Sequence, residues 1–113
     1  MLSSDLLIAS QAAAAATAAG AEFAHAPSAA AVQQQLDQHP ADLIAIDLAS
    51  CEKSLEQLVP QLRQLAPAAL QIVAFGPHVH HARLAAARAA GCDQVLTRGQ
   101  FHAEMQQLFA GGG

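Results

Sequence analysis

The segment Pro40-Ala41-Asp42-Leu43-Ile44-Ala45-Ile46-Asp47-Leu48 carries the clearest structural signal in the chain. Its centre, Leu43 to Ile46, is a continuous apolar run between two aspartates, which is typical of a strand covered on both faces. Pro40 ends any helix before it, because the residue preceding a proline avoids the helical region. The segment therefore predicts a buried strand with a carboxylate, Asp47, at its carboxyl end.

Short β-rich runs and helical segments alternate on both sides of this strand. Apolar runs predict further strands at residues 6–9, 21–26, 72–75 and 95–97. Helical spacing predicts helices at residues 11–19, 29–38, 55–65, 80–90 and 101–109, with a kink at Pro60. Such alternation implies right-handed crossovers and a parallel sheet. We therefore expect an α/β fold, a flavodoxin-like doubly wound sheet of five parallel strands in the order 2-1-3-4-5 with helices on both faces.

Composition limits the class of protein. The 113 residues fit one domain, which we place at residues 1–110, with residues 111–113 as a flexible glycine tail. The net charge of −4 and only five basic residues argue against nucleic-acid binding. Asp5 stands where a signal peptide needs positive charge, and polar residues interrupt any membrane-length apolar span. Cys51 and Cys92 lack CxxC spacing and are expected to be reduced thiols. We expect a cytoplasmic, bacterial protein without membrane contact.

Laid out in this order, the chain resembles the receiver domain of two-component response regulators over nearly its full length. The segment 40–48 is similar to the family's helix stop, third strand and acceptor aspartate. The segment Ala89-Ala90-Gly91-Cys92-Asp93-Gln94-Val95-Leu96-Thr97-Arg98 is similar to the family's Gly-Ala-Asp-Asp-Tyr-Leu-x-Lys stretch. The resemblance implies that Asp47 occupies the phosphoryl-acceptor position and that Arg98 occupies the position of the family's lysine.

The chain departs from the receiver pattern at the positions that support phosphorylation. Receivers carry two adjacent acids after the first strand, whereas the strand expected at residues 6–9 is followed by Ser10 and Gln11. Gly76 replaces the Thr or Ser after the fourth strand, and Arg98-Gly99 replaces Lys-Pro. Phosphoryl transfer depends on neutralising charge, and Mg²⁺ needs several oxygen ligands. We therefore expect a degenerate receiver, a pseudo-receiver, that has no cofactor, is not phosphorylated by the usual Mg²⁺-dependent route and is not an enzyme.

Ligands of open α/β sheets bind at the carboxyl ends of the strands. Around Asp47, the side chains and backbone expected at this edge come from Ser10, Gln11, Cys51, Gly76 and His78. Two interpretations of Asp47 remain open. We favour an ion pair with Arg98, because arginine makes a fixed bidentate partner for a carboxylate. Alternatively, Asp47 accepts a phosphoryl group by an atypical route or a hydrogen bond from a ligand.

A histidine-rich segment, Pro77-His78-Val79-His80-His81, follows the fourth expected strand. Imidazoles bind Zn²⁺, Ni²⁺ and Cu²⁺, so a second hypothesis is a metal- or small-ligand-binding protein that uses Asp47, His78, His80 and Arg98. Against it, His80 and His81 would point about 100° apart on a helix. An exposed turn and helix start is the favoured interpretation.

The leading hypothesis is a signalling or protein-interaction module. In receivers the fourth helix, fifth strand and fifth helix commonly mediate pairing, and residues 82–90, 95–98 and 102–108 correspond to that face. We expect a protein partner or a homodimer there. A small hydrolase is disfavoured because no catalytic constellation is evident, and no Gly-x-Ser-x-Gly elbow surrounds a serine.

Overall fold

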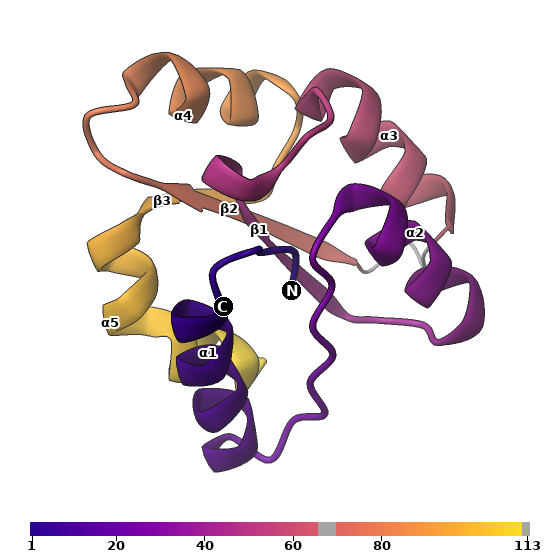
Figure 1. Cartoon of the computed structure of the whole chain (residues 1–113), viewed down its shortest axis with the longest axis vertical. Helices are drawn as coiled ribbons and strands as arrows, with labels where there is room; N and C mark the ends of the chain where they lie inside the picture. Colours follow the sequence, from indigo (N-terminus) through magenta and orange to yellow (C-terminus); the bar gives the residue numbers. More distant parts are fainter. Residues whose placement is uncertain (66–69, 112–113) are drawn as a thin grey trace.

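The computed structural model describes residues 1–65 and 70–111. Its elements, in chain order, are α1 (Leu6–Ala18), α2 (Ala29–Gln38), β1 (Leu43–Asp47), the short 3-10 helix η1 (Leu48–Ser50), α3 (Leu55–Leu65), β2 (Gln71–Gly76), α4 (His81–Ala89), β3 (Gln94–Thr97) and α5 (Arg98–Phe109). The three strands are parallel and adjacent in the order β1-β2-β3 (Figure 1). Of the predicted tail, residues 112–113 lie outside the described residues.

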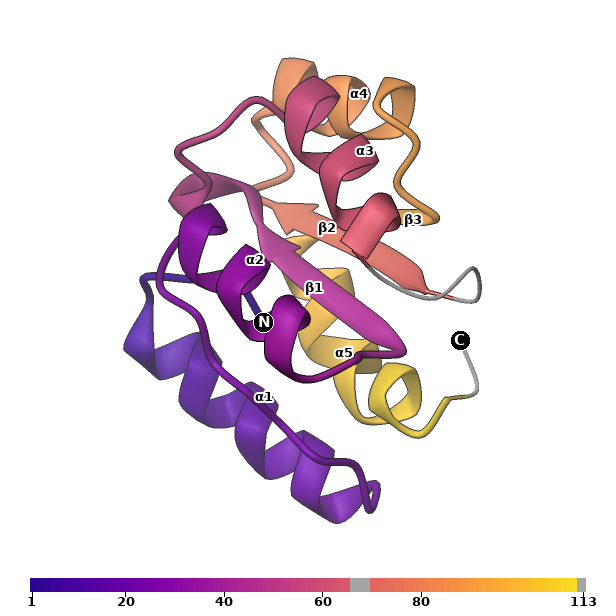
Figure 2. The same cartoon turned by 90° about the vertical axis from the view of Figure 1, so that its right-hand side faces the viewer.

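Helices cover both faces of the sheet, with α2, α3 and α4 on one side and α1 and α5 on the other (Figures 1 and 2). Successive strand side chains point to opposite faces. Ile44 and Ile46 of β1 therefore belong to the core beneath α2, α3 and α4, whereas Ala45 joins the core beneath α1 and α5. In that second core Phe75 stacks on Phe101 with ring centroids 4.0 Å apart. The doubly covered α/β architecture predicted from the sequence is confirmed.

The strand predicted at residues 6–9 is wrong, because this run begins helix α1. Asp5 caps the helix by accepting hydrogen bonds from the backbone N–H groups of Leu7 and Ile8. Only part of the apolar run is buried, since Leu6 and Leu7 are 74% and 69% exposed. A capped start followed by alanine favours a helix over a strand. The predicted boundary of residues 11–19 therefore began too late.

The place of the first strand is taken by Met1–Ser3. Leu2 donates its backbone N–H to Ala45 at 2.8 Å and accepts from the backbone N–H of Asp47 at 2.8 Å. Leu2 also forms isolated parallel bridges with Ile46 and Ala26. The spatial order Ala26, Leu2, β1, β2, β3 follows the predicted 2-1-3-4-5. The first two positions are single bridges and not strands, so the predictions of five strands and of a strand at residues 21–26 are wrong.

Two helix predictions need comment. α5 begins at Arg98 instead of residue 101, because Thr97 and Gln100 form a capping box at its start. Pro60 lies inside α3 on its exposed side. None of the described helices has the length and apolar character needed to cross a membrane.

Candidate functional site

Asp47 is the last residue of β1, and its side chain is buried, with 1% of the residue exposed. Its Oδ2 atom accepts hydrogen bonds from the hydroxyls of Ser3 at 2.8 Å and Ser50 at 3.0 Å. Its Oδ1 atom accepts from the backbone N–H of Ala49 at 3.1 Å. Within the described residues, each of these contacts comes from a neutral donor. We call Asp47, Ser3 and Ser50 the hydroxyl cage.

The backbone explains why two serines reach this carboxylate. Pairing of Leu2 with β1 places Ser3 beside the end of that strand. Asp47 also caps η1, and the tight turn of η1 brings Ser50 back over the carboxylate. Ser4 extends the cage outward, because its backbone N–H and its hydroxyl both lie within hydrogen-bond distance of Ser50 Oγ, at 2.9 and 3.0 Å.

The prediction that Ser10 and Gln11 stand at the position of the receiver acidic pair is therefore wrong. Ser10 and Gln11 are exposed side chains on α1 and lie outside the contacts made by Asp47. The residues that follow Leu2, the residue that pairs with β1, are Ser3 and Ser4. Both residues carry hydroxyls, and the next residue, Asp5, carries a carboxylate that caps α1 and binds Arg98.

The predicted ion pair between Asp47 and Arg98 is wrong. The guanidinium of Arg98 binds the carboxylate of Asp5, which caps the start of α1. Hydrogen bonding from the backbone of Ile8, followed by the contact with Arg98, lowers the pKa of Asp5. Arg98 lies in the first turn of α5, and α1 packs beside α5, so these two helices bring the pair together.

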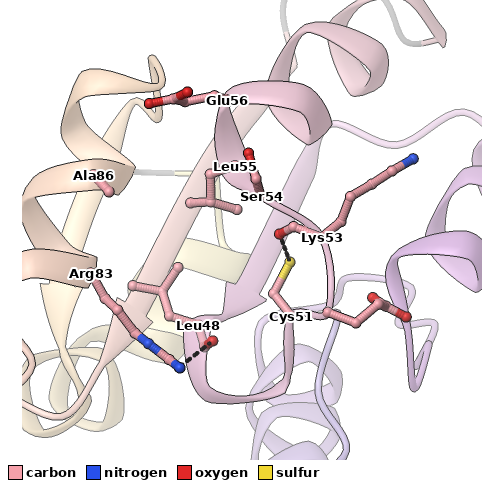
Figure 3. Close-up of a pocket in the computed structure, with 9 residues that line it drawn as sticks. Leu48, Cys51, Lys53, Ser54, Leu55, Glu56, Arg83 and Ala86 are labelled. Atoms are coloured by element: carbon pink, nitrogen blue, oxygen red, sulfur yellow. Dashed lines mark hydrogen bonds between the residues drawn. The ribbon is translucent and has the colours of Figure 1, made fainter.

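Gly76 lies at the end of β2, as predicted. A β-carbon at this position would stand 3.4 Å from both Cβ and Cδ1 of Leu48. The side chain of Leu48, the residue that follows Asp47, therefore packs beside Gly76 at van der Waals distance from such a β-carbon. The guanidinium of Arg83, on α4, also donates a hydrogen bond to the carbonyl oxygen of Leu48 at 3.2 Å (Figure 3).

The three histidines do not assemble with Asp47. His78, His80 and His81 are exposed in the connection between β2 and α4 and at the start of α4. No group of three or more His, Cys, Asp or Glu side chains among residues 1–65 and 70–111 is arranged to hold a metal ion. The residues of the metal-binding hypothesis are thus separated, with Asp47 inside the hydroxyl cage and Arg98 on Asp5.

Cys51 lies in an open pocket of about 480 Å³ between the loop after η1 and α4 (Figure 3). Its thiol donates to the carbonyl oxygen of Lys53 at 3.1 Å, and burial raises its pKa. Cys92 packs against the same apolar core as Cys51, and burial raises the pKa of Cys92 to about 11. Raised pKa values disfavour thiolates, so neither cysteine has the character of a reactive nucleophile.

Solved structures with a similar fold are response-regulator receivers. The receiver domain of NtrX from Brucella abortus has a TM-score of 0.77 at 13% identity, covering 99% of this chain and 97% of that chain. A putative response regulator from Chloroflexus aurantiacus has a TM-score of 0.77 at 19% identity, covering 97% and 93%. A response regulator from Burkholderia pseudomallei, solved with a phosphorylated aspartic acid, a calcium ion and citrate, has a TM-score of 0.75 at 16% identity, covering 99% and 70%.

No protein-family model matches the sequence, and no curated protein matches it either. Similarity at these identities shows the fold alone. The chain therefore has the α/β fold of response-regulator receiver domains, with a hydroxyl cage at the end of its central strand.

Proposed function

We propose that this chain is a receiver-like signalling module that acts through protein contacts and does not use Asp47 as a Mg²⁺-dependent phosphoryl acceptor. The observation that carries the proposal is the hydroxyl cage, in which Ser3 and Ser50 satisfy a buried carboxylate with neutral hydrogen bonds. The receiver fold supports a signalling role, and the cage supports the loss of the usual chemistry.

The cage removes the electrostatic reason for binding a divalent cation. Adjacent carboxylates repel one another, and a bound cation relieves that repulsion. Here Asp47 is the one carboxylate of the cage, while Ser3 and Ser4 supply hydroxyls. Mg²⁺ prefers near-octahedral oxygen coordination with one or two carboxylates and is reluctant to lose water. A cation would have to displace hydrogen bonds from Asp47 and would find no second carboxylate within the cage.

The positively charged side chain nearest in role to the receiver lysine, that of Arg98, is also paired with another carboxylate. Arg98 occupies the position of the receiver lysine, but its guanidinium is bound to Asp5. A phosphoryl group on Asp47 would therefore lack both a metal ion and a direct cation partner. Phosphoryl transfer to Asp47 is disfavoured because nothing neutralises the negative charge of its transition state.

We infer that partners bind the face formed by α4, β3 and α5, either as another protein or as a second copy of this chain. β3 is an edge strand whose residues are all half-buried, and the exposed side of α4 carries four alanines beside His81, Arg83 and Arg88. Close helix packing favours such small residues. Light scattering at high micromolar concentration tests the homodimer, and a monomer mass there removes it. A bacterial cytoplasmic setting is consistent with the bacterial sources of the similar structures.

Incubation with acetyl phosphate or beryllofluoride and Mg²⁺ tests the proposal directly. Intact mass before and after hydroxylamine treatment detects an acyl phosphate, which hydroxylamine cleaves. We expect no hydroxylamine-labile phosphoryl group, in contrast to an authentic receiver treated in parallel. A labile group that is lost in Asp47→Asn would overturn the proposal.

A further inference from the structure

Helix α4 and the turns on either side of it carry positive charge on a negatively charged protein. Residues 77–92 hold two of the five basic residues of the chain and none of its nine acidic residues. With the histidines neutral, this segment has a net charge of +2, whereas the rest of the chain, with three basic and nine acidic residues, has a net charge of −6. Such a patch selects its partners by charge.

Neither arginine of α4 has a carboxylate partner among the described residues. The two ion pairs found within residues 1–65 and 70–111 use the other two arginines of the chain. Arg83 donates to the carbonyl oxygen of Leu48, and Arg88 lies exposed in the last turn of α4. A guanidinium has five N–H donors in a planar fork that matches a carboxylate. Each arginine therefore keeps donors for a carboxylate that comes from outside the chain.

The outer side of α4 has the shape to receive a helix. Its exposed positions include four alanines, at Ala82, Ala85, Ala86 and Ala89. At about 100° per residue these alanines form a ridge on the side away from the core, with Arg83 and Arg88 about 110° to either side of its middle. Figures 1 and 2 show no described element over this side of α4. Small side chains let two helix axes approach to about 8 Å, so a helix on the alanine ridge comes within reach of both arginines.

We propose that the alanine ridge of α4 binds an amphipathic acidic helix of another protein, whose carboxylates at both edges pair with Arg83 and Arg88. This inference rests on the proposed function, because it names the chemistry of the partner that the face containing α4 binds. The apolar stripe of the partner helix packs on the ridge, and its acidic edges set the specificity of binding.

The pocket beside Arg83 adds an apolar contact to this surface. Leu48, Leu55 and Ala86 are among the residues that line it (Figure 3). It accepts an apolar side chain from the stripe of the partner helix. Glu56 also lines the pocket, at the opposite end from Arg83 in Figure 3, so the carboxylate of the partner belongs at the arginine end.

Charge disfavours a second copy of this chain as the occupant of the ridge. Two α4 helices that face one another bring arginines together, and neither helix contains an acid. The other described helices do not supply two acidic edges, because α1 has no charged residue and α2, α3 and α5 carry one acid each, at Asp37, Glu56 and Glu104. The partner is therefore a different protein.

Two synthetic helical peptides test the charge rule with the full chain. The first has alanine and leucine on one stripe and glutamate at both edges of that stripe, and the second has lysine in place of each glutamate. We expect the glutamate peptide to bind at least about tenfold more tightly by fluorescence anisotropy, with amide shifts centred on α4. A tenfold difference needs about 1.4 kcal/mol, which two exposed ion pairs gained and two like-charge contacts avoided supply together.

Charge reversal of the two arginines is the decisive variant. Arg83→Glu with Arg88→Glu should bind the lysine peptide more tightly than the glutamate peptide. Gln34→Glu with Gln38→Glu, at exposed positions of α2, changes the net charge as much as Arg88→Glu alone and should keep the parent's preference. Thermal unfolding confirms that each variant is folded. Arg88→Glu, which should weaken the preference, keeps the proposal testable if loss of the contact with Leu48 unfolds the double variant.

The outcomes separate this inference from the proposed function. Equal affinity for the two peptides, amide shifts away from α4, or no binding of either peptide below about 1 mM, a weak −4 kcal/mol, overturns the inference and leaves the proposed function standing. A dimer in light scattering that dissociates in Arg88→Glu also overturns it, because a second copy would then occupy the ridge. A labile phosphoryl group on Asp47 overturns the proposed function, whereas the preference for the glutamate peptide would still hold.

Discussion

Replacing Ser3 with aspartate reintroduces a second carboxylate into the hydroxyl cage. Ser3 Oγ lies 2.8 Å from Asp47 Oδ2, and both residues are buried. Two like charges about 4 Å apart repel by about 4 kcal/mol at an effective dielectric constant of about 20. The variant also loses the hydrogen bond that Ser3 donates to a charged group. We therefore expect Ser3→Asp to lower the free energy of unfolding by at least about 4 kcal/mol at neutral pH without metal.

The same substitution should create a response to Mg²⁺. A cation that binds only the folded pair, at a concentration about 100 times its dissociation constant, raises the free energy of unfolding by about 2.7 kcal/mol. Urea unfolding with Mg²⁺ and with a chelator measures both effects. The loss should shrink at acid pH, because one of two neighbouring carboxyls then takes up a proton.

Ser10→Asp, on the exposed face of α1, is the matched control and should change little under either condition. The reasoning about the cage is refuted if Ser3→Asp is as stable as the parent without metal. It is also refuted if Mg²⁺ stabilises Ser10→Asp and Ser3→Asp equally.

The other predictions concern stability and thiol reactivity. The pKa of Asp93 is lowered by a hydrogen bond from a backbone N–H and by the contact with Arg63. Asp93 therefore contributes to the free energy of unfolding above its unfolded pKa, and this contribution is lost as the pH falls through the lower folded value. The urea midpoint of Asp93→Asn should lie below that of the parent at pH 7, and the two midpoints should converge at acid pH. Asp37→Asn, at an exposed position, is the control. Cys92, with a pKa of about 11, should react with iodoacetamide at pH 7 far more slowly than an exposed model thiol, and a rate that matched the model thiol would contradict this. Thr97→Ala should lower stability by about 1 kcal/mol through loss of the α5 cap, and an unchanged urea midpoint would argue against that role.

Local sequence pattern was enough to predict the three strands of the sheet and the helices that cover them. The apolar run of β1 and the glycine that ends β2, Gly76, are strong short-range signals. The first strand failed because Met1–Ser3 is too short for a pattern and pairs only through Leu2 with a strand more than 40 residues away. The signal that could have corrected it was Asp5, a good N-cap directly before an alanine-rich helix.

The candidate site was predicted only in part for the same reason. Asp47 was found because it ends a recognisable strand, but its partners depended on where the first strand lies. Moving that strand to Met1–Ser3 brings Ser3 to the carboxylate and leaves Asp5 to bind Arg98. The contact between Asp5 and Arg98 joins residues 93 positions apart, and no local pattern encodes it.

The cage also determines how an asparagine at position 47 behaves. Ser3 and Ser50 both donate to Oδ2, while the backbone N–H of Ala49 donates to Oδ1. An amide offers only one acceptor oxygen. If the amide oxygen faces the two serines, the amide N–H₂ group faces the N–H of Ala49. If the amide is reversed, both serine hydroxyls must turn their protons away, and Ser50 can no longer accept a hydrogen bond from Ser4 as before. Either orientation leaves a donor without an acceptor, which costs about 1 to 3 kcal/mol in a buried site. Asp47 therefore ties the first extended segment, β1 and η1 together, and that structural role is reason enough for an aspartate here without phosphorylation.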